Sequence, residues 1–379
     1  MQLRRIANRP TRRGILGIGA VILLVVGAAA GWWLLRPFEG VRATVVQDGL
    51  EHPWDIAFAD DGRMLVTERI GRVRVYAGPQ GGAELLHTAA IPDVRAELES
   101  GLMGIAVDAS SVFVCATRGT ADPASWQVQL LRTTLASDGS LSPFEALPIG
   151  PIRGAPRHQG CAVEIDAAGD VWLSVGDANL PAGENGAQDP GRLNGKVLRV
   201  HPDGTVPADN PFGPESPVVS LGHRNPQGLA FGPGGRIVAV EHGTAENDEI
   251  NVIEHGGNYG YPCFTGVDAV GPIPDGCGTA TDYLGPAWAS GAPTLATSGI
   301  TFLAGAAWGD WEGNLVVTTL KEQDLRRFTL ADDGSVMEAE TLLDGRFGRL
   351  RAAVIGPDGA LYLSTANGDD QIIRVDPPG

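Results

Sequence analysis

One repeated unit dominates the hydrophobic pattern of the chain. An apolar run leads to a short turn, usually with glycine, and a second apolar run follows and ends in polar residues. Asp-Gly between two apolar runs is typical of a β-hairpin, because glycine adopts the positive φ that a tight turn requires. The pattern predicts six such hairpins, over residues 56–68, 104–117, 163–177, 229–242, 300–319 and 354–366.

These hairpins indicate an all-β fold. Six units over about 340 residues leave about 57 residues for each, enough for four short strands and a loop. Repetition of a β unit is typical of a propeller, whose blades surround a central channel. The sequence therefore predicts a six-bladed β-propeller of four-stranded antiparallel blades. A β-sandwich or two smaller β domains are the alternatives, but no linker-like change of composition follows residue 40, which favours one closed domain over residues 37–379.

A different pattern occupies the first 36 residues. Five arginines precede an apolar run of 21 residues from 15 to 35, which is long enough to cross a bilayer as a helix. Basic residues before such a helix keep the N-terminus in the cytoplasm and place the remainder outside. We therefore predict that a transmembrane or signal helix within residues 1–36 anchors an extracytoplasmic domain, in the periplasm or at the cell surface, to the cytoplasmic membrane. A cleaved signal and a twin-arginine export signal are the alternatives.

Charge narrows the class of partner. The chain has a net charge of −17, and residues 37–379 alone carry 22 basic and 45 acidic side chains. A protein that binds nucleic acid needs a basic footprint, so this composition argues against nucleic acid as a partner.

The four cysteines suit the oxidising compartment that the N-terminus indicates. Cys263 and Cys277 flank a loop rich in glycine and proline and make a natural pair, which leaves Cys115 for Cys161. Four cysteines allow three pairings, however, and the sequence alone leaves them open.

Polar side chains follow the predicted hairpins. His158 precedes the third hairpin and Asp177 ends it, so one hairpin can place a carboxylate beside an imidazole and raise its basicity. Arg224, Asn225 and Gln227 lie close together between two apolar runs just before the fourth hairpin. Polar groups at the end of a strand usually face a cleft, because a buried loop would leave polar groups without partners. No Gly-x-Ser-x-Gly motif is present to support a serine hydrolase.

Four cations near the ends of hairpins point to an anionic ligand. They are Arg224, Lys321, Arg349 and Arg351. Arginine and lysine both suit carboxylates or phosphates. Ordinary ion pairs with the many acidic residues are the alternative for any single cation, but four cations directed at one channel indicate an anion site. The acidic segment 241–251 offers oxygen ligands to calcium, although on its own it is more typical of a solvated loop.

A series of short motifs follows one another along the chain. They are Pro53-Trp54, Thr67-Glu68-Arg69, residues 101–106, His158, Gly176-Asp177, and residues 195–199, 222–228, 248–251, 258–262 and 349–351. With these motifs the sequence resembles the glucose/sorbosone dehydrogenase family, the soluble aldose dehydrogenases that depend on pyrroloquinoline quinone (PQQ). The resemblance runs from about residue 50 to residue 375, and the number and order of the motifs make it specific. Cys161 and Ala162 depart from it, because they follow Gly160 where the family usually has Gly-Gly-Arg.

The resemblance implies a six-bladed propeller and a role for each polar cluster. His158 would be the general base that removes the proton of a sugar hydroxyl, and Asp177 would orient it. Arg224 would stabilise negative charge that develops on the quinone oxygen. Gly243 and Thr244 would offer backbone carbonyls to a calcium ion that polarises the quinone. The residues implied for cofactor binding are Arg224, Asn225, Gln227, Lys321, Arg349 and Arg351.

The leading hypothesis is a quinoprotein that oxidises an aldose sugar at its anomeric carbon to a lactone and passes the electrons to an external acceptor. Two alternatives come from other classes of protein. One is a metal-dependent propeller lactonase or hydrolase, with Asp177, Asn225 and Asp248 as available ligands. The other is a non-catalytic extracellular propeller that binds a partner or a glycan, since propellers support many functions.

Overall fold

The computed structural model describes residues 40–181, 183–266, 268–269 and 277–378. The predicted N-terminal helix, with its anchor segment 15–35 and the boundary at residue 36, lies outside these residues. A compact unit extends from Arg42 to Gly379. In the part of the chain that is described, no helix is long and apolar enough to cross a membrane.

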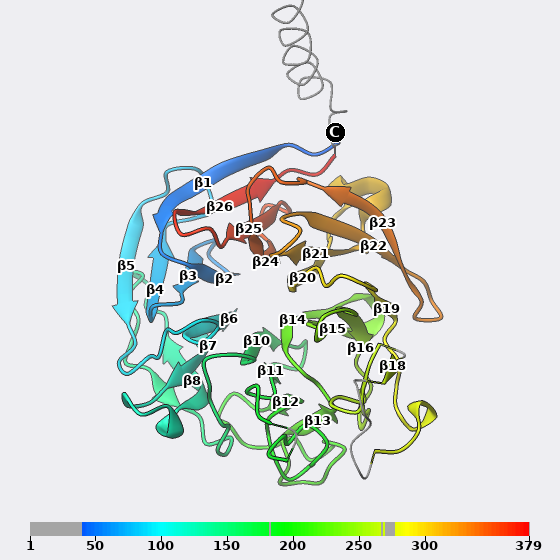
Figure 1. Cartoon of the computed structure of the whole chain (residues 1–379). Coiled ribbons are helices and arrows are strands. Elements are labelled where there is room, and N and C mark those ends of the chain that lie inside the picture. The colour runs from blue at the N-terminus through cyan, green and yellow to red at the C-terminus, as the bar shows by residue number, and fades with distance from the viewer. Residues whose placement is uncertain (1–39, 182, 267, 270–276, 379) are drawn as a thin grey trace, which may run out of the picture. The chain divides into compact units, whose positions relative to one another are not determined.

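Six antiparallel four-stranded sheets, counted over the described residues, are arranged in a ring around a common axis (Figure 1). The prediction of a six-bladed propeller is therefore confirmed, and each predicted hairpin coincides with the first two strands of one sheet. The first three blades contain β2 (Pro53–Phe58), β3 (Met64–Glu68), β4 (Arg72–Tyr76) and β5 (Leu85–Ala90); β6 (Leu102–Asp108), β7 (Ser111–Arg118), β8 (Gln127–Thr134) and β9 (Glu145–Ala146); and β10 (Gly160–Ile165), β11 (Val171–Val175), β12 (Lys196–Val200) and β13 (Val218–Leu221).

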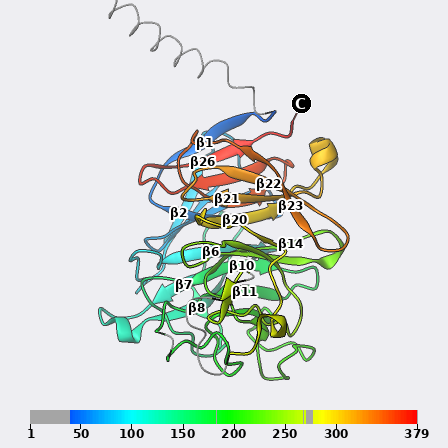
Figure 2. The same ribbon diagram turned by 45° about the vertical axis from the view of Figure 1, so that its right-hand side comes forward.

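The last blade combines the first strand of the propeller with its last three strands. β1 pairs with β26, which places Ala43 opposite Val375 and closes the ring. Both views show these two strands side by side (Figures 1 and 2). The last three blades contain β14 (Pro226–Phe231), β15 (Ile237–Glu241), β16 (Glu249–Val252) and β19 (Trp288–Ala289); β20 (Thr297–Phe302), β21 (Leu315–Thr319), β22 (Leu325–Leu330) and β23 (Val336–Leu342); and β24 (Leu350–Ile355), β25 (Leu361–Thr365), β26 (Asp370–Val375) and β1 (Ala43–Leu50).

A few short elements lie in the loops between neighbouring strands of the same blade. They are the hairpin of β17 (Phe264–Thr265) and β18 (Asp268–Ala269), and the 3-10 helices Pro123–Ser125, Pro233–Gly235, Ala280–Asp282 and Ala306–Trp311. The apolar core lies between neighbouring blades, where the alternate buried side chains of one sheet pack on those of the next.

The innermost strands β2, β6, β10, β14, β20 and β24 contact one another in that order, and β24 returns to β2. Glycine permits this close approach. A Cβ atom at Gly104 would lie 2.3 Å from the carbonyl oxygen of Cys161 on the next blade, and one at Gly228 would lie 2.3 Å from that of Ser298. Any larger residue at these two positions would force the blades apart.

Two disulfides are present, Cys115–Cys161 and Cys263–Cys277. Of the three pairings that the sequence left open, the structure has the one that joins the cysteines flanking the Gly/Pro-rich loop. The bond between Cys115 in β7 and Cys161 in β10 crosses from one blade to the next, three residues from His158. Disulfides of this kind are typical of proteins outside the cytoplasm, as the composition indicated.

Two carboxyl groups face the axial channel. Asp55 of β2 and Glu164 of β10 line a small cavity, about 30 Å³ in volume, to which all six innermost strands contribute. Burial raises the pKa of Asp55 to about 7. Burial, and then the charge of Asp55, raises the pKa of Glu164 to about 8. The folded chain therefore holds protons at this position that an unfolded chain would release near pH 4.5.

This difference in proton binding predicts a pH dependence of stability. The stabilisation is complete below the unfolded pKa of Glu164 and is lost as the pH rises to its folded value of about 8. A Glu164→Gln variant should therefore lose less stability between pH 5 and pH 8, with a gain over the parent on the order of 2 kcal/mol at pH 8. Melting curves of both chains over this range would test it, and parallel curves would contradict it.

Candidate active site

The strand order places the predicted site residues on one face of the propeller. In each antiparallel sheet, the start of the innermost strand and the end of the second strand lie at the same end of the blade. His158 precedes β10, Arg224 precedes β14, and Asp177 follows β11, so all three side chains come from that end. The other predicted site residues also lie at the start of an innermost strand or after the end of a second strand. They are Asn225, Gln227, Gly243, Thr244, Lys321, Arg349 and Arg351.

His158 and Asp177 are in contact. His158 Nδ1 and Asp177 Oδ1 are 2.8 Å apart, and the two side chains are 9% and 1% exposed. An ionised carboxylate can only accept hydrogen bonds, so Nδ1 of the neutral imidazole carries the proton and Nε2 is the basic atom. Asp177 is fixed in turn by the backbone N–H of Asn179 at 2.8 Å and by the side-chain amide of Asn185 at 2.9 Å.

Arg224 is attached to the same pair through the backbone. Its carbonyl oxygen accepts the N–H of Asp177 at 2.8 Å, and its own N–H donates to Glu241 at 2.7 Å. One terminal guanidinium nitrogen donates to the carbonyl oxygen of His242 at 3.2 Å. Nε is buried and has no hydrogen-bond partner among the described residues. Buried donors without a partner are uncommon, so an anionic ligand that accepts from Nε fits this position.

Glu99, which the sequence analysis did not single out, lies between His158 and Asn225. One oxygen accepts the backbone N–H of His158 at 3.0 Å and is 3.4 Å from the Asn225 amide nitrogen, while the Asn225 oxygen accepts from Gly160 at 3.1 Å. Burial opposes the ionisation of Glu99, but the hydrogen bond from the backbone N–H of His158 and the electrostatic attraction of His158, His242 and Arg157 outweigh it and lower its pKa. Glu99 precedes β6 much as His158 precedes β10, and this correspondence between blades was the signal that could have found it.

Arg351 is a buried cation on the same face. It is 9% exposed, donates to Gln227 at 3.2 Å, and lies with its guanidinium carbon 3.6 Å from the centre of the Trp54 ring. Burial, and then the charges of Arg349 and Arg69, lowers the pKa of Arg351 to about 9. A positive charge that is incompletely balanced in a buried position favours an anionic ligand.

Arg349 and Lys321 lie at the exposed rim of this face. Arg349 donates to the carbonyl oxygen of Leu320 at 3.1 Å, and Lys321 donates to that of Thr294 at 2.8 Å. Neither forms an ion pair with another of the residues that the structure describes. Both cations therefore stay available to an anion at the mouth of the channel.

Arg69 and Tyr261 also belong to this cluster, although sequence reasoning gave neither a role. Arg69 Nε is buried without a partner among the described residues, like Arg224 Nε. The Tyr261 ring centre lies 6.0 Å from the guanidinium carbon of Arg224, and burial, followed by the charge of Asp177, raises the pKa of Tyr261. Tyr261 comes from a long irregular loop after β16, where no periodic pattern marks it.

The predicted calcium segment is a tight loop after β15. Asp248 is fully buried and holds the loop, because it accepts the N–H of Gly243 at 2.9 Å and that of Leu295 at 2.8 Å. Among the described residues, no group of three or more His, Cys, Asp or Glu side chains is arranged to hold a metal ion. A calcium ion here would depend on backbone oxygens, and the carbonyls of Gly243 and Thr244 accept no hydrogen bond within the described part of the chain.

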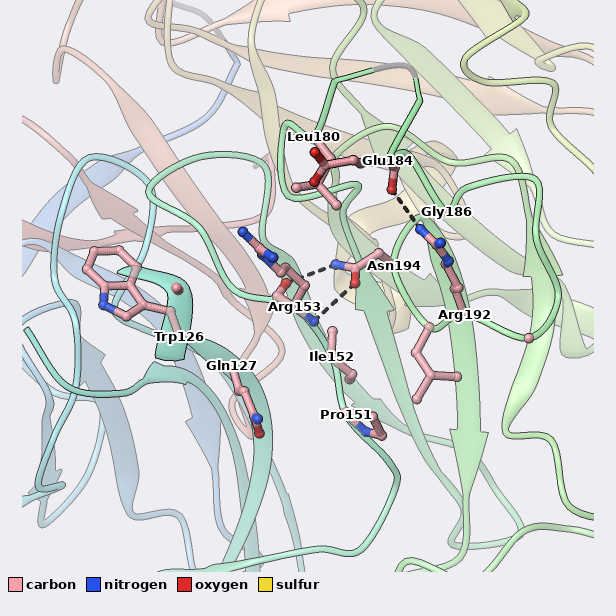
Figure 3. Close-up of a pocket in the computed structure, with 13 residues that line it drawn as sticks. Trp126, Gln127, Pro151, Ile152, Arg153, Leu180, Glu184, Gly186, Arg192 and Asn194 are labelled. Atoms are coloured by element: carbon pink, nitrogen blue, oxygen red, sulfur yellow. Dashed lines mark hydrogen bonds between the residues drawn. The ribbon is translucent and has the colours of Figure 1, made fainter. Parts of the chain in front are cut away.

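A cleft of about 450 Å³ lies beside the segment that follows Asp177 (Figure 3). Leu180, Glu184 and Arg192 of this segment form one side, and Trp126 and Arg153 lie across from them. The side chain of Asn194 bridges the two sides, since its oxygen accepts the N–H of Arg153 at 3.1 Å and its nitrogen donates to the Arg153 carbonyl at 2.9 Å.

Known proteins resemble this chain over most of its length. The family described as Glucose / Sorbosone dehydrogenase matches residues 50–374. The chain belongs to this family. It is 30% identical over 357 residues to aldose sugar dehydrogenase YliI of Escherichia coli, an alignment that covers 89% of this chain and 93% of that protein. It is 28% identical over 316 residues to quinoprotein glucose dehydrogenase B of Acinetobacter calcoaceticus, covering 75% and 64% of the two chains.

Two solved structures, both of aldose sugar dehydrogenases, superpose on this chain. The apo form of soluble aldose sugar dehydrogenase from Escherichia coli superposes with a TM-score of 0.79 at 28% identity, over 89% of this chain and 99% of that one. The PQQ-bound aldose sugar dehydrogenase of Streptomyces coelicolor superposes with a TM-score of 0.73 at 27% identity, over 90% and 99% of the two chains.

Proposed function

We propose that this member of the glucose/sorbosone dehydrogenase family is a PQQ-dependent dehydrogenase that oxidises an aldose sugar at C1 to a lactone. The observation that carries the proposal is the His158–Asp177 pair, which lies on the same face as several buried or half-buried arginines. A base beside an anion site is the combination that this reaction requires. Two family relatives, described as an aldose sugar dehydrogenase and a quinoprotein glucose dehydrogenase, support the substrate class.

The residues present fit PQQ. The cofactor is a planar quinone with several carboxylates, and the site offers Arg224 and Arg351, in buried or half-buried positions, together with Lys321 and Arg349 at the rim. Arg224 Nε is a buried donor that no described residue satisfies. Asn225 and Gln227 provide amide groups between these cations. Gly243 and Thr244 would hold calcium through their carbonyl oxygens, and the family relative solved with PQQ supports the cofactor.

In the proposed reaction, oxidation of a cyclic aldose removes a hydride from C1 and a proton from the C1 hydroxyl, and a carbonyl forms. PQQ, when bound, supplies the electrophilic centre that accepts the hydride. His158 Nε2 accepts the hydroxyl proton. Asp177 keeps the Nδ1 proton in place and stabilises the imidazolium that forms, and Arg224 balances negative charge on the cofactor. An external acceptor must then remove the two electrons.

Cofactor-induced stabilisation tests the proposal. A ligand that binds only the folded chain at 100 times its Kd stabilises it by about 2.7 kcal/mol. We therefore expect PQQ with calcium to raise the melting temperature of the full-length chain by about 5 °C, with a smaller rise when a chelator removes calcium. Dye reduction across a panel of aldoses would then define the substrate.

Two results would redirect the assignment. No thermal shift and no dye reduction would leave a propeller that only binds a partner or glycan. Lactone hydrolysis without added quinone would instead support a hydrolase. The two readouts therefore separate the three classes of function considered from the sequence.

A further inference from the structure

Lys196 is a fully buried cation that the proposed mechanism does not use. Its side chain is inaccessible to solvent, and Nζ donates to the carbonyl oxygens of Gly186 at 2.7 Å, Ala187 at 2.9 Å and Asn194 at 2.8 Å. These three bonds satisfy all the donors of an ammonium group. Burial lowers the pKa of Lys196 to about 7, and the three carbonyl acceptors oppose this shift because they favour the charged ammonium. A buried charge needs such partners, and here all of them come from the segment 186–194.

The strand register places Lys196 next to the two segments that carry Asp177 and Arg224. Lys196 is the first residue of β12 and pairs with Val175 of β11 on one side and Leu221 of β13 on the other. Asp177 lies two residues after Val175, and Arg224 lies three residues after Leu221. The segments that lead from this sheet to Asp177 and to Arg224 therefore begin next to Lys196.

A continuous set of hydrogen bonds leads from Lys196 to Asp177. Ala187, whose carbonyl oxygen accepts from Lys196, donates its N–H to the side-chain oxygen of Asn185 at 2.9 Å. The amide nitrogen of Asn185 donates to Asp177 Oδ2 at 2.9 Å. Because the other oxygen of Asp177 contacts His158, the position of residues 185–187 determines how this carboxylate is presented to the imidazole.

A second branch leads toward Arg224. The carbonyl oxygen of Ala187 also accepts the N–H of Gly222 at 2.9 Å. Gly195 connects the same segment to the end of β11, because its backbone N–H donates to the carbonyl oxygen of Gly176 at 3.0 Å. Its φ angle is +70°, a conformation that favours glycine. A Cβ atom there would lie 2.5 Å from that of Ala187, so only glycine lets the segment approach closely enough for the ammonium to bind it.

We propose that Lys196 is a positioning residue for the oxidation of the sugar. Its ammonium crosslinks residues 186–194, fixes the Asn185 amide on Asp177, and so sets the orientation and basicity of His158. The inference rests on the proposed function, in which His158 is the base. In this proposal Lys196 contacts neither the sugar nor the cofactor, and Asn185 is the residue that links the Lys196 crosslink to Asp177.

Replacement of Lys196 by methionine tests the proposal, because the side chain keeps its length and loses its donors. In the full-length chain we expect a fall in kcat of about tenfold and a change in sugar KM below about twofold. The acid limb of the kcat/KM pH profile, which reports the base of the free enzyme, should shift. Amide hydrogen exchange of residues 184–195 in the cofactor-free chain should become faster.

The matched control is Leu363→Ala, a fully buried change in β25 of another blade. It destabilises the fold but should leave kcat, the pH profile and the exchange of residues 184–195 as in the parent. Unchanged kcat, pH profile and exchange in Lys196→Met would overturn the proposal. Equal losses of activity in the two variants at equal melting temperatures would also overturn it, because they would show a general effect of stability.

Asn185→Ala provides an independent test, which stands even where Lys196→Met fails to fold. It should lower kcat and shift the same limb of the pH profile, and the double variant should be less impaired than the product of the two single effects. A normal pH profile in Asn185→Ala contradicts the inference. Failure of the parent to turn over any sugar with PQQ contradicts the proposed function instead, and hydrogen exchange of the cofactor-free variants then still decides whether Lys196 orders the segment.

Discussion

Replacement of His158 by alanine is expected to lower the rate of sugar oxidation by a factor of about 10² to 10⁴, the usual contribution of a general base. The imidazole is the basic group that Asp177 holds at 2.8 Å, and alanine leaves Nε2 without a substitute. Binding of PQQ should stay close to that of the parent, because the predicted cofactor contacts come from arginine, lysine and amide side chains. Steady-state dye reduction and the thermal shift with PQQ measure the two effects separately.

The same blade offers a matched control. His201 Nδ1 contacts Asp170 Oδ1 at 2.6 Å, so it forms a second His–Asp pair, but it follows β12 and lies at the opposite end of the sheet from His158. His201→Ala should therefore retain full turnover. Retained turnover in His158→Ala would remove this residue from the mechanism, and a loss of thermal shift would show that its role is in cofactor binding.

The fold could be predicted from sequence because the repeat is local. Asp-Gly at residues 61–62 and 358–359 lies between two adjacent strands, and a hairpin needs only its own turn and alternation to be recognised. The closure of the last blade by β1 was not predictable in this way. Its pairing with β26 joins Ala43 to Val375, and no local pattern records a partner more than 300 residues away.

The site shows the same division between local and distant signals. His158, Asp177 and Arg224 were found because each polar residue follows or precedes an apolar run, and the antiparallel blade brings those positions to one face. Glu99 was missed although it occupies the equivalent position before β6, because a lone carboxylate in an acidic chain carries no distinctive signal. The shared blade position is thus a better guide to this site than residue type alone.

Lys196 illustrates what alternation cannot reveal. It lies in an apolar strand, where a lysine is usually read as a solvated residue at the strand end. Its three acceptors are backbone carbonyls of residues 186, 187 and 194, and a carbonyl is present at every residue whatever its type. Only the path of the loop brings these oxygens together, so the crosslink has no signature in the sequence.

The burial of each cation predicts how much it contributes to the affinity for PQQ. An Arg351→Met variant should bind PQQ about 30- to 1000-fold more weakly, because truncating one partner of a buried charge pair costs about 2–4 kcal/mol. Arg349→Met and Lys321→Met should each weaken binding by about fivefold or less, since exposed ion pairs contribute at most about 1 kcal/mol. Titration of each cofactor-free variant with PQQ in the presence of calcium measures these differences.

The same Arg351→Met substitution should not destabilise the cofactor-free protein, although it weakens cofactor binding. Its guanidinium is 9% exposed and lies among other cations, so methionine removes a buried charge while keeping most of the contact with Trp54. The cofactor-free Arg351→Met chain should therefore melt at the same temperature as the parent or higher. Arg236→Met, in the turn between β14 and β15 at the far end of the blade, controls for loss of charge and should change neither property. Weaker folding together with unchanged PQQ affinity in Arg351→Met would mean that this arginine stabilises the propeller and does not bind the cofactor.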